Sequence, residues 1–163
     1  FSKPVQASAR FAYRLAINGP MTTEGPQVSE LLRALQPDPL NRHRWACPNG
    51  ADARMCQSAV EMPGAPAQPW IRVEAGTPKG ILSHDSFRSA TLRNERTVTV
   101  YTPAGYAEDA TSSDLLIVFD EGAYLNLVPT PTILDNLIAA KRIRPTVAVF
   151  LGNPSADTRT AEL

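Results

Sequence analysis

The sequence predicts an α/β fold with a parallel sheet in the second half of the chain, after a first part built mainly of strands. Two apolar runs carry this prediction. Leu115–Phe119 ends on Asp120 and a nearby Gly122, and Val147–Leu151 follows after an amphipathic helical segment. A buried strand, a helix and a second buried strand form a βαβ unit, whose two strands are parallel. Because ligands gather where the strands of such a sheet end, we expect a functional site directly after these runs.

The first part of the chain has short elements separated by prolines. Phe11–Ile17 alternates large apolar side chains with small or charged ones, which is typical of a half-buried strand. Val28–Leu35 has the leucine spacing of a short helix, and Ser58–Met62 is a further short strand. The composition changes again at Gly76–Gly80. We therefore expect two domains, residues 1–75 and residues 76–163.

The second part begins with a predicted hairpin. Phe87–Leu92 and Thr97–Tyr101 are two strand-like segments joined by a polar turn. After the first apolar run, Pro131 stands where the first turn of a helix is expected, a position where its missing N–H costs nothing. The apolar stripe of that helix consists of Ile133, Leu134, Leu137 and Ile138.

Composition and charge exclude several classes of function. The 163 residues contain 43% hydrophobic and 20% charged residues, as in ordinary globular proteins. Sixteen basic residues balance sixteen acidic ones, so no net field would attract nucleic acid or an anionic membrane surface. The longest apolar runs are far shorter than the roughly 20 residues of a membrane-spanning helix. We expect neither a nucleic-acid partner nor a membrane partner.

The two cysteines, Cys47 and Cys56, have three possible states. They stand nine positions apart with a turn-forming Pro48-Asn49-Gly50 segment between them. We expect free thiols, while a disulfide-closed loop is the alternative in an oxidising compartment. Zinc would need two more ligands, and His43 is the only nearby candidate. We expect neither a metal nor another cofactor.

Several segments follow one another in an order and spacing typical of one family. They are Asp38–Asn41, Ser58–Trp70, Asn94–Pro103, Phe119-Asp120, Val128–Leu137, Arg144–Val149 and Arg159–Leu163. Together these segments resemble the enterochelin esterases of the α/β-hydrolase superfamily. The resemblance lies in their order and spacing, since no one motif would suffice, and it is most specific from Phe87 to Leu163.

The resemblance implies a fold and an activity. Residues 1–75 would be part of an immunoglobulin-like β-sandwich, and residues 76–163 the first half of a three-layer α/β-hydrolase domain. A small self-contained α/β domain is the alternative. Members of the family hydrolyse ester bonds, notably those of iron-loaded catecholate siderophores, and so release iron. Their nucleophile lies on a Gly-x-Ser-x-Gly elbow and a histidine follows it, but the chain contains no such elbow. We therefore expect part of a serine esterase, truncated before the nucleophile and inactive by itself.

The retained part of the implied site is the loop after the first parallel strand. In α/β-hydrolases this loop supplies a backbone N–H of the oxyanion hole. The family usually has Asp-Gly-Glu here, whereas this chain has Asp120-Glu121-Gly122. We expect Glu121 or Gly122 to be the N–H donor. The alternative is a tight turn that needs glycine for its backbone angles, with Asp120 as a structural hydrogen-bond acceptor.

Arg159 is the candidate for substrate binding. Its planar guanidinium would grip an anionic ferric catecholate, with Glu162 holding it in place and Tyr124 lining the same cleft. The alternative is an exposed salt bridge that contributes little. We expect His84 to be structural and His43 to be solvated.

The implied partners are an ester substrate such as a ferric catecholate siderophore, and either the remainder of the hydrolase domain or a second copy. We expect a cytoplasmic protein, or a periplasmic one if Cys47 and Cys56 form a disulfide. A different class of function remains open, namely a carbohydrate-binding-like module attached to a feruloyl- or acetyl-type esterase. Sugar stacking needs several coplanar aromatic rings, and the first half offers only Tyr13, Trp45 and Trp70.

Overall fold

The structure is a computed structural model that describes residues 4–20, 25, 27–45, 47, 56–107, 113–155 and 158–159. The chain divides into two compact units, Phe1–Ala67 and Gln68–Leu163. The division thus lies a few residues before the expected one at residue 75, and the units are described one by one. In the part of the chain that the structure describes, no helix is long and apolar enough to cross a membrane.

The described part of the N-terminal unit contains two small antiparallel sheets and one α-helix. A three-stranded sheet has the order β1-β5-β4, and a two-stranded sheet pairs β2 with β3. The elements are β1 Arg10–Tyr13, β2 Leu15–Ala16, α1 Val28–Ala34, β3 Leu35–Gln36, β4 Arg44–Trp45 and β5 Gln57–Glu61. The helix expected at Val28 and the strand expected at Ser58 are confirmed.

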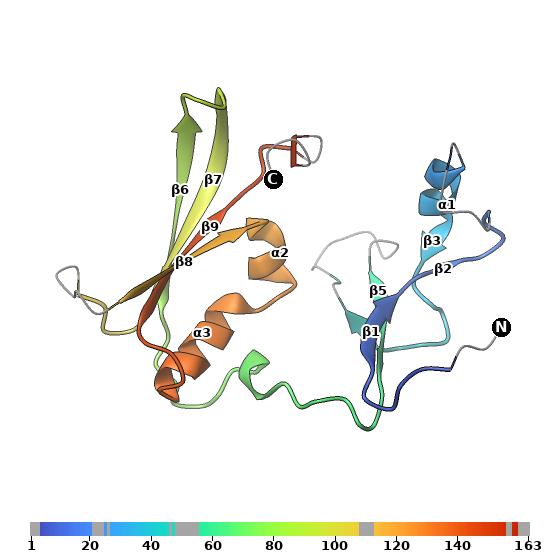
Figure 1. The fold of residues 1–163 in the computed structure, drawn as a ribbon, viewed down its shortest axis with the longest axis horizontal. Helices are drawn as coiled ribbons and strands as arrows, with labels where there is room; N and C mark the ends of the chain where they lie inside the picture. Colours follow the sequence, from blue (N-terminus) through green and yellow to red (C-terminus); the bar gives the residue numbers. More distant parts are fainter. Residues whose placement is uncertain are drawn as a thin grey trace. The chain divides into compact units, whose positions relative to one another are not determined.

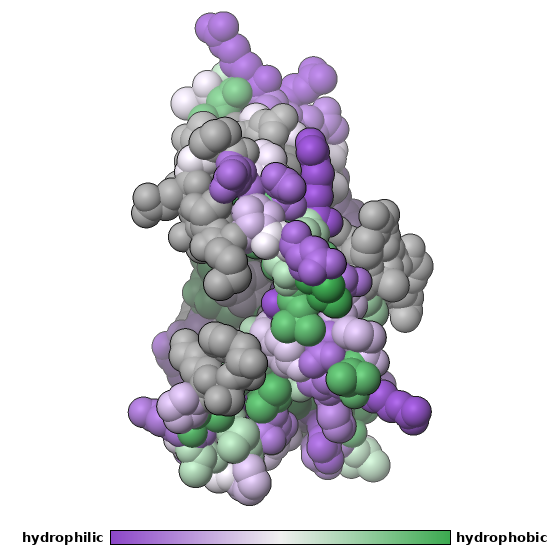
Figure 2. All heavy atoms as spheres, turned by 90° about the vertical axis from the view of Figure 1, so that its right-hand side faces the viewer, coloured by the Kyte–Doolittle hydropathy of each residue, from purple (hydrophilic) through white to green (hydrophobic). Residues whose placement is uncertain are grey.

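The strand expected over Phe11–Ile17 differs from the prediction in two ways. It is interrupted at Arg14, where the chain passes from one sheet to the other. The large apolar side chains of Phe11, Leu15 and Ile17 are exposed rather than buried. On the face of the molecule drawn in Figure 2, hydrophobic side chains likewise reach the surface in small groups between hydrophilic ones. The β-sandwich expected for this part of the chain stays a prediction.

The Asp38-Pro-Leu-Asn segment forms a hydrogen-bonded corner against the three-stranded sheet. The Asp38 carboxylate accepts a hydrogen bond from the Tyr13 hydroxyl at 2.7 Å and one from the Leu40 N–H at 2.8 Å. The hydrogen bond from Tyr13 is the main reason that the pKa of Asp38 lies below its ordinary value. The Ser58 hydroxyl accepts from the Asp38 N–H at 2.8 Å and is fully buried. The corner therefore fixes the chain between β3 and β4.

The two cysteines are bonded to each other. The Cys47–Cys56 disulfide joins the end of β4 to the start of β5, with 4.4 Å between the Cα atoms. The expectation of free thiols is therefore wrong, because the pairing of β4 with β5 brings the two residues together.

The C-terminal unit is built on a four-stranded mixed sheet with the order β6-β7-β9-β8 (Figure 1). The strands are β6 Ile81–Ser89, β7 Asn94–Thr102, β8 Asp114–Phe119 and β9 Thr146–Leu151. β6 and β7 form the expected antiparallel hairpin, with longer strands and an earlier turn than predicted. β8 and β9 are parallel, as the βαβ pattern predicted. The antiparallel pair β7–β9 joins the hairpin to the βαβ unit.

Two helices connect β8 to β9, where the sequence predicted only one. The expected helix is α3 Thr130–Ala139, with a proline in its first turn. The unexpected one is α2 Glu121–Asn126, which starts directly after Asp120 and occupies what was predicted to be a loop. Both helices lie on the same side of the sheet (Figure 1). A short 3-10 helix, η2 Pro69–Ile71, is tied to α3 by the buried side chain of Asn136, which donates to two backbone carbonyls near it.

The hydrophobic core lies between the sheet and α3. It consists of Tyr101, Leu134, Ala148 and Phe150. β9 is the central partner of β7 and β8, and every second residue of β9 is buried. β8 is an edge strand, and its expected full burial is not found, since Leu115, Ile117 and Phe119 are 66%, 54% and 48% exposed. These three alternate with Val118, which packs against the core, so they point to the opposite face of the sheet.

Candidate functional site

The candidate site lies at the carboxyl ends of the two parallel strands. Phe119 pairs with Leu151 at the last position of β8 and β9, so the residues after them emerge side by side. Asp120 and the first turn of α2 follow β8, while Gly152 and Asn153 follow β9. This is the edge at which open α/β sheets place their ligands.

Asp120 forms the turn between β8 and α2. Its backbone is left-handed, with φ 57° and ψ 49°, a conformation that aspartate tolerates better than most residues. Its carbonyl accepts the N–H of Ala123 at 2.9 Å and that of Tyr124 at 3.3 Å, which starts the helix. Its carboxylate does not cap the helix. The side chain is therefore free to face the residues that follow β9.

The Asp120 carboxylate binds Arg159 with both oxygens. Arg159 donates from Nε to Oδ1 and from Nη2 to Oδ2, each at 2.6 Å, and Asn153 Nδ2 also donates to Oδ1 at 2.6 Å. The hydrogen bonds from Arg159, followed by that from Asn153, lower the pKa of Asp120 from 3.8 to about 2. Asp120 in turn raises the pKa of Arg159. This pair ties the β8–α2 turn to the segment after β9.

Asp120 is a hydrogen-bond acceptor, as the alternative interpretation of the sequence had it. Asp120 also holds the Arg159 side chain in place, a role that the sequence analysis had assigned to Glu162. Glu162 lies outside the described residues. One feature of the sequence could have indicated the ion pair between Asp120 and Arg159. Each of these residues follows one of the two strands predicted to be parallel, and such strands end at the same edge of the sheet. Asn153 was missed, although it occupies the position after Gly152 in the same predicted loop.

Gly122 is the second residue of α2 and is exposed. It does not take a left-handed conformation, since the positive φ belongs to Asp120, and a Cβ added to it would meet no atom within 4 Å. The alternative that Gly122 is needed for the backbone angles of a turn is therefore wrong. Tyr124, two residues further along α2, is 41% exposed. Glu121 turns its carboxylate inward, toward the hydroxyls of Thr97 and Thr99.

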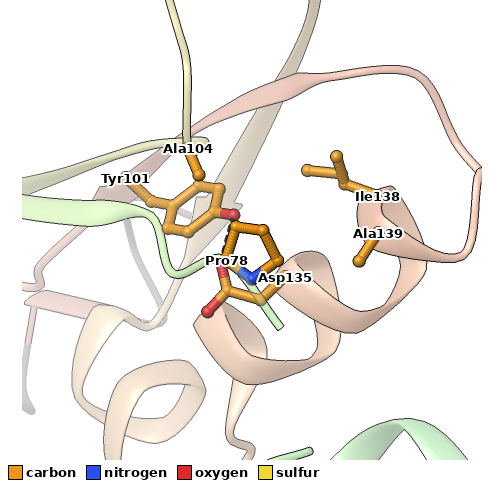
Figure 3. Close-up of a pocket in the computed structure, with 6 residues that line it drawn as sticks. All are labelled: Pro78, Tyr101, Ala104, Asp135, Ile138 and Ala139. Carbon is orange, nitrogen blue, oxygen red and sulfur yellow. Dashed lines mark hydrogen bonds between the residues drawn. The ribbon is translucent and has the colours of Figure 1, made fainter. Parts of the chain in front are cut away.

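A small pocket lies at the other end of the same sheet (Figure 3). It has a volume of about 90 Å³ and is lined by Pro78, Tyr101, Ala104, Asp135, Ile138 and Ala139. The buried Tyr101 hydroxyl donates to Asp135 at 2.8 Å, and burial together with this carboxylate raises the pKa of Tyr101. Tyr101 pairs with Ala148, three residues before the end of β9. The pocket is thus separate from the Asp120 site, and its volume suits a few water molecules rather than a siderophore.

Tyr13 and Trp45, two of the candidates for sugar stacking, do not lie on one face of the sheet. Tyr13 pairs with Ser58, and Trp45 pairs with the neighbouring Gln57. Adjacent residues of a strand point to opposite faces, so Tyr13 and Trp45 lie on opposite sides of the sheet. The Tyr13 hydroxyl is also engaged with Asp38.

The chain is similar to enterochelin and enterobactin esterases in sequence and in structure. Residues 1–71 match the family model described as "Enterochelin esterase, N-terminal". The fold matches the ferric enterobactin esterase from Salmonella typhimurium with a TM-score of 0.72 and 25% identity, over 99% of this chain and 43% of that esterase. It matches an enterobactin esterase from Shigella flexneri, solved in the presence of enterobactin, with a TM-score of 0.70 and 24% identity, over 98% and 41%.

A third match is the enterochelin esterase from Shigella flexneri, with a TM-score of 0.58 and 26% identity, over 84% of this chain and 33% of that one. No curated protein sequence matches the chain. The chain spans less than half the length of each of these esterases. The resemblance to the enterochelin esterase family that the sequence motifs predicted is confirmed, by the family model over residues 1–71 and by the fold over nearly the whole chain.

Proposed function

We propose that this chain is part of a serine esterase that hydrolyses the ester bonds of a ferric catecholate siderophore and thereby releases its iron. The observation that carries the proposal is the match of 99% of the chain to a ferric enterobactin esterase. The finer assignment of the two units, to part of a β-sandwich and to the first half of an α/β-hydrolase domain, belongs to the same proposal. The nucleophilic serine and its histidine would come from outside these 163 residues.

In this reaction the β8–α2 turn would bind the oxyanion. The serine oxygen attacks the ester carbonyl, and the negative charge that develops on the carbonyl oxygen needs fixed N–H donors. Glu121 and Gly122 open α2, where N–H groups have no acceptor within the helix. The open space above Gly122 leaves room for an ester carbonyl to approach. Collapse of the intermediate expels the alcohol and leaves an acyl-serine, which water then hydrolyses.

Arg159 would bind the anionic part of the substrate. Its guanidinium carries five N–H donors in a planar fork, and Asp120 accepts two of them. The side chain is 52% exposed, so an anion in solution can reach it. Asp120 thus fixes the direction of the fork and leaves its outer edge for catecholate oxygens. Tyr124 and Glu162 complete the proposed substrate-binding set.

The Cys47–Cys56 disulfide favours the periplasm over the cytoplasm as the place of this reaction. Structural disulfides persist in oxidising compartments and are rare in the cytosol. We therefore infer that the protein works in an oxidising compartment. Thiol labelling of protein taken directly from cells should modify neither cysteine before reduction. Labelling of both without a reductant would place the protein in the cytoplasm.

The esterase assay compares the 163-residue chain with a full-length protein that contains it. The full-length protein should hydrolyse a ferric catecholate ester. The chain alone should show no turnover above background, because N–H donors without a nucleophile and a base retain only a small part of the acceleration. Turnover by the chain alone would contradict its being part of the enzyme, and an inactive full-length protein would contradict the proposed function.

A pair of variants separates substrate contact from a structural role of Arg159. In the full-length protein, Arg159→Ala should raise KM for the ferric catecholate ester by about tenfold, since hydrogen bonds to charged groups are strong. KM for a small neutral ester should change far less. Asp120→Asn is the matched control, because it disrupts the same pair but keeps the guanidinium. Equal losses in both variants and on both esters would show that Arg159 acts only through Asp120.

A further inference from the structure

The Glu121 side chain reaches across β9 to β7. Glu121 follows β8, and β9 lies between β8 and β7. The Glu121 carboxylate nevertheless accepts hydrogen bonds from the hydroxyls of Thr97 and Thr99, both on β7. The first turn of α2 is therefore attached to a strand that is not its neighbour in the sheet.

Gly152 leaves the space that this contact needs. It directly follows β9 and is buried, and its N–H donates to the Thr97 carbonyl at 2.9 Å. A Cβ at this position would overlap the Thr97 hydroxyl and would lie 2.8 Å from Glu121 Oε2. Any larger residue would therefore displace the carboxylate or the threonine.

The cluster continues from Glu121 through Thr99 to His84. Thr99 is 1% exposed, and its hydroxyl is hydrogen-bonded to the Glu121 carboxylate. His84 Nδ1 lies 2.7 Å from the same hydroxyl oxygen, and its role as donor or acceptor depends on the tautomer of the ring. The buried Thr99 hydroxyl therefore has partners on two sides, which hold it in place.

We propose that Glu121 is a positioning residue, whose carboxylate, held by Thr97 and Thr99, sets the place of the backbone at Glu121 and Gly122. α2 has only six residues, too few to be a stable helix by itself. Asp120 fixes the turn toward the segment after β9, and Glu121 fixes it toward β7. Oxyanion donors act only when held in place before the reaction, and a displacement of about 1 Å can cost a hundredfold in rate. This inference rests on the proposed function.

The kinetic test uses the full-length protein and substitutions on β7. Thr99→Val removes the buried hydroxyl with little change in volume, and should lower kcat by about ten- to a hundredfold while KM changes less than threefold. Thr99→Ser keeps the hydroxyl and should restore most of kcat. Gly152→Ala should resemble Thr99→Val. Thr102→Val is the matched control, because Thr102 is the last residue of the same strand, and it should leave kcat unchanged.

A second measurement follows the turn without relying on activity. Amide hydrogen exchange in the 163-residue chain should become faster at Ala123 and Tyr124 in Thr99→Val, while the amides of α3 keep their rates. Unchanged kcat and unchanged exchange would overturn the proposal, and so would faster exchange throughout the C-terminal unit. A full-length protein without esterase activity would overturn only the proposed function, because exchange would still decide whether Glu121 holds the turn.

Discussion

Asp120, Glu121 and Gly122 each have a different task in the β8–α2 turn. Asp120 takes the left-handed backbone conformation and binds Arg159, while Glu121 reaches the hydroxyls of β7. Gly122 has neither task, and the space beside it is open. A glycine with no conformational need, at the carboxyl end of a parallel strand, points to close approach of a ligand to the backbone.

The substitution Gly122→Ala tests this interpretation. Alanine is the better helix former, so the free energy of unfolding should rise, by up to about 1 kcal/mol. In the full-length protein, the added methyl group should obstruct the approach of the ester and lower kcat by about tenfold or more. Urea unfolding and ester hydrolysis measure the two effects. A more stable variant with unchanged kcat would remove Gly122 from the oxyanion site.

The stability contribution of Asp120 should depend on pH. Its pKa is lowered from 3.8 to about 2, so the folded state binds this proton less readily than the unfolded state does. The contribution is therefore fully present above about pH 4 and is lost as the pH falls toward 2. The stability difference between the wild-type chain and Asp120→Asn should shrink over this range, as followed by urea unfolding from pH 2 to 6. Arg159→Ala should show the same trend, and a difference independent of pH would contradict the assignment.

Among the elements, β8 and β9 are both apolar but occupy different positions in the sheet. Both are short apolar runs, yet β9 is central and alternately buried, whereas β8 is at the edge. α2 and α3 cover one face of the sheet, and the core lies there. On the other face, no described element covers Leu115, Ile117 and Phe119. An exposed apolar edge strand favours association.

We expect the 163-residue chain to associate through this strand, with itself or with the remainder of the hydrolase domain. Ile117→Lys places a charge in the middle of the exposed apolar row and should shift the chain toward monomer in sedimentation velocity. Leu40→Lys is the matched control, since Leu40 is 92% exposed and lies in the other unit, so it should leave association unchanged. A wild-type chain that stays monomeric at high concentration and binds no hydrophobic dye would favour a small self-contained domain.

At the scale of the whole molecule, the two units are stabilised by different means. The N-terminal unit has short strands, a disulfide and the Asp38 corner. The C-terminal unit has a longer sheet, a hydrophobic core and the candidate site. The family model matches the first 71 residues, and the fold match extends across both units. The proposed chemistry belongs to the C-terminal unit.

The sequence by itself determined the hairpin, the parallel βαβ unit, α3 and the family resemblance. Each depends on local patterns: alternation over a strand, the spacing of an apolar helix face, a proline in a first turn and the order of motifs. The sequence also predicted a candidate site after the first parallel strand, because parallel strands end at one edge.

Only the tertiary structure decided which side chains meet at that edge. Asp120 and Arg159 are 39 residues apart, and Glu121 reaches Thr99 only because β9 lies between β8 and β7 with a glycine after it. It also decided that β8 is an exposed edge strand rather than a buried one. The physical reason is that strand order and register bring distant residues together. Neither is encoded in the local period of the chain.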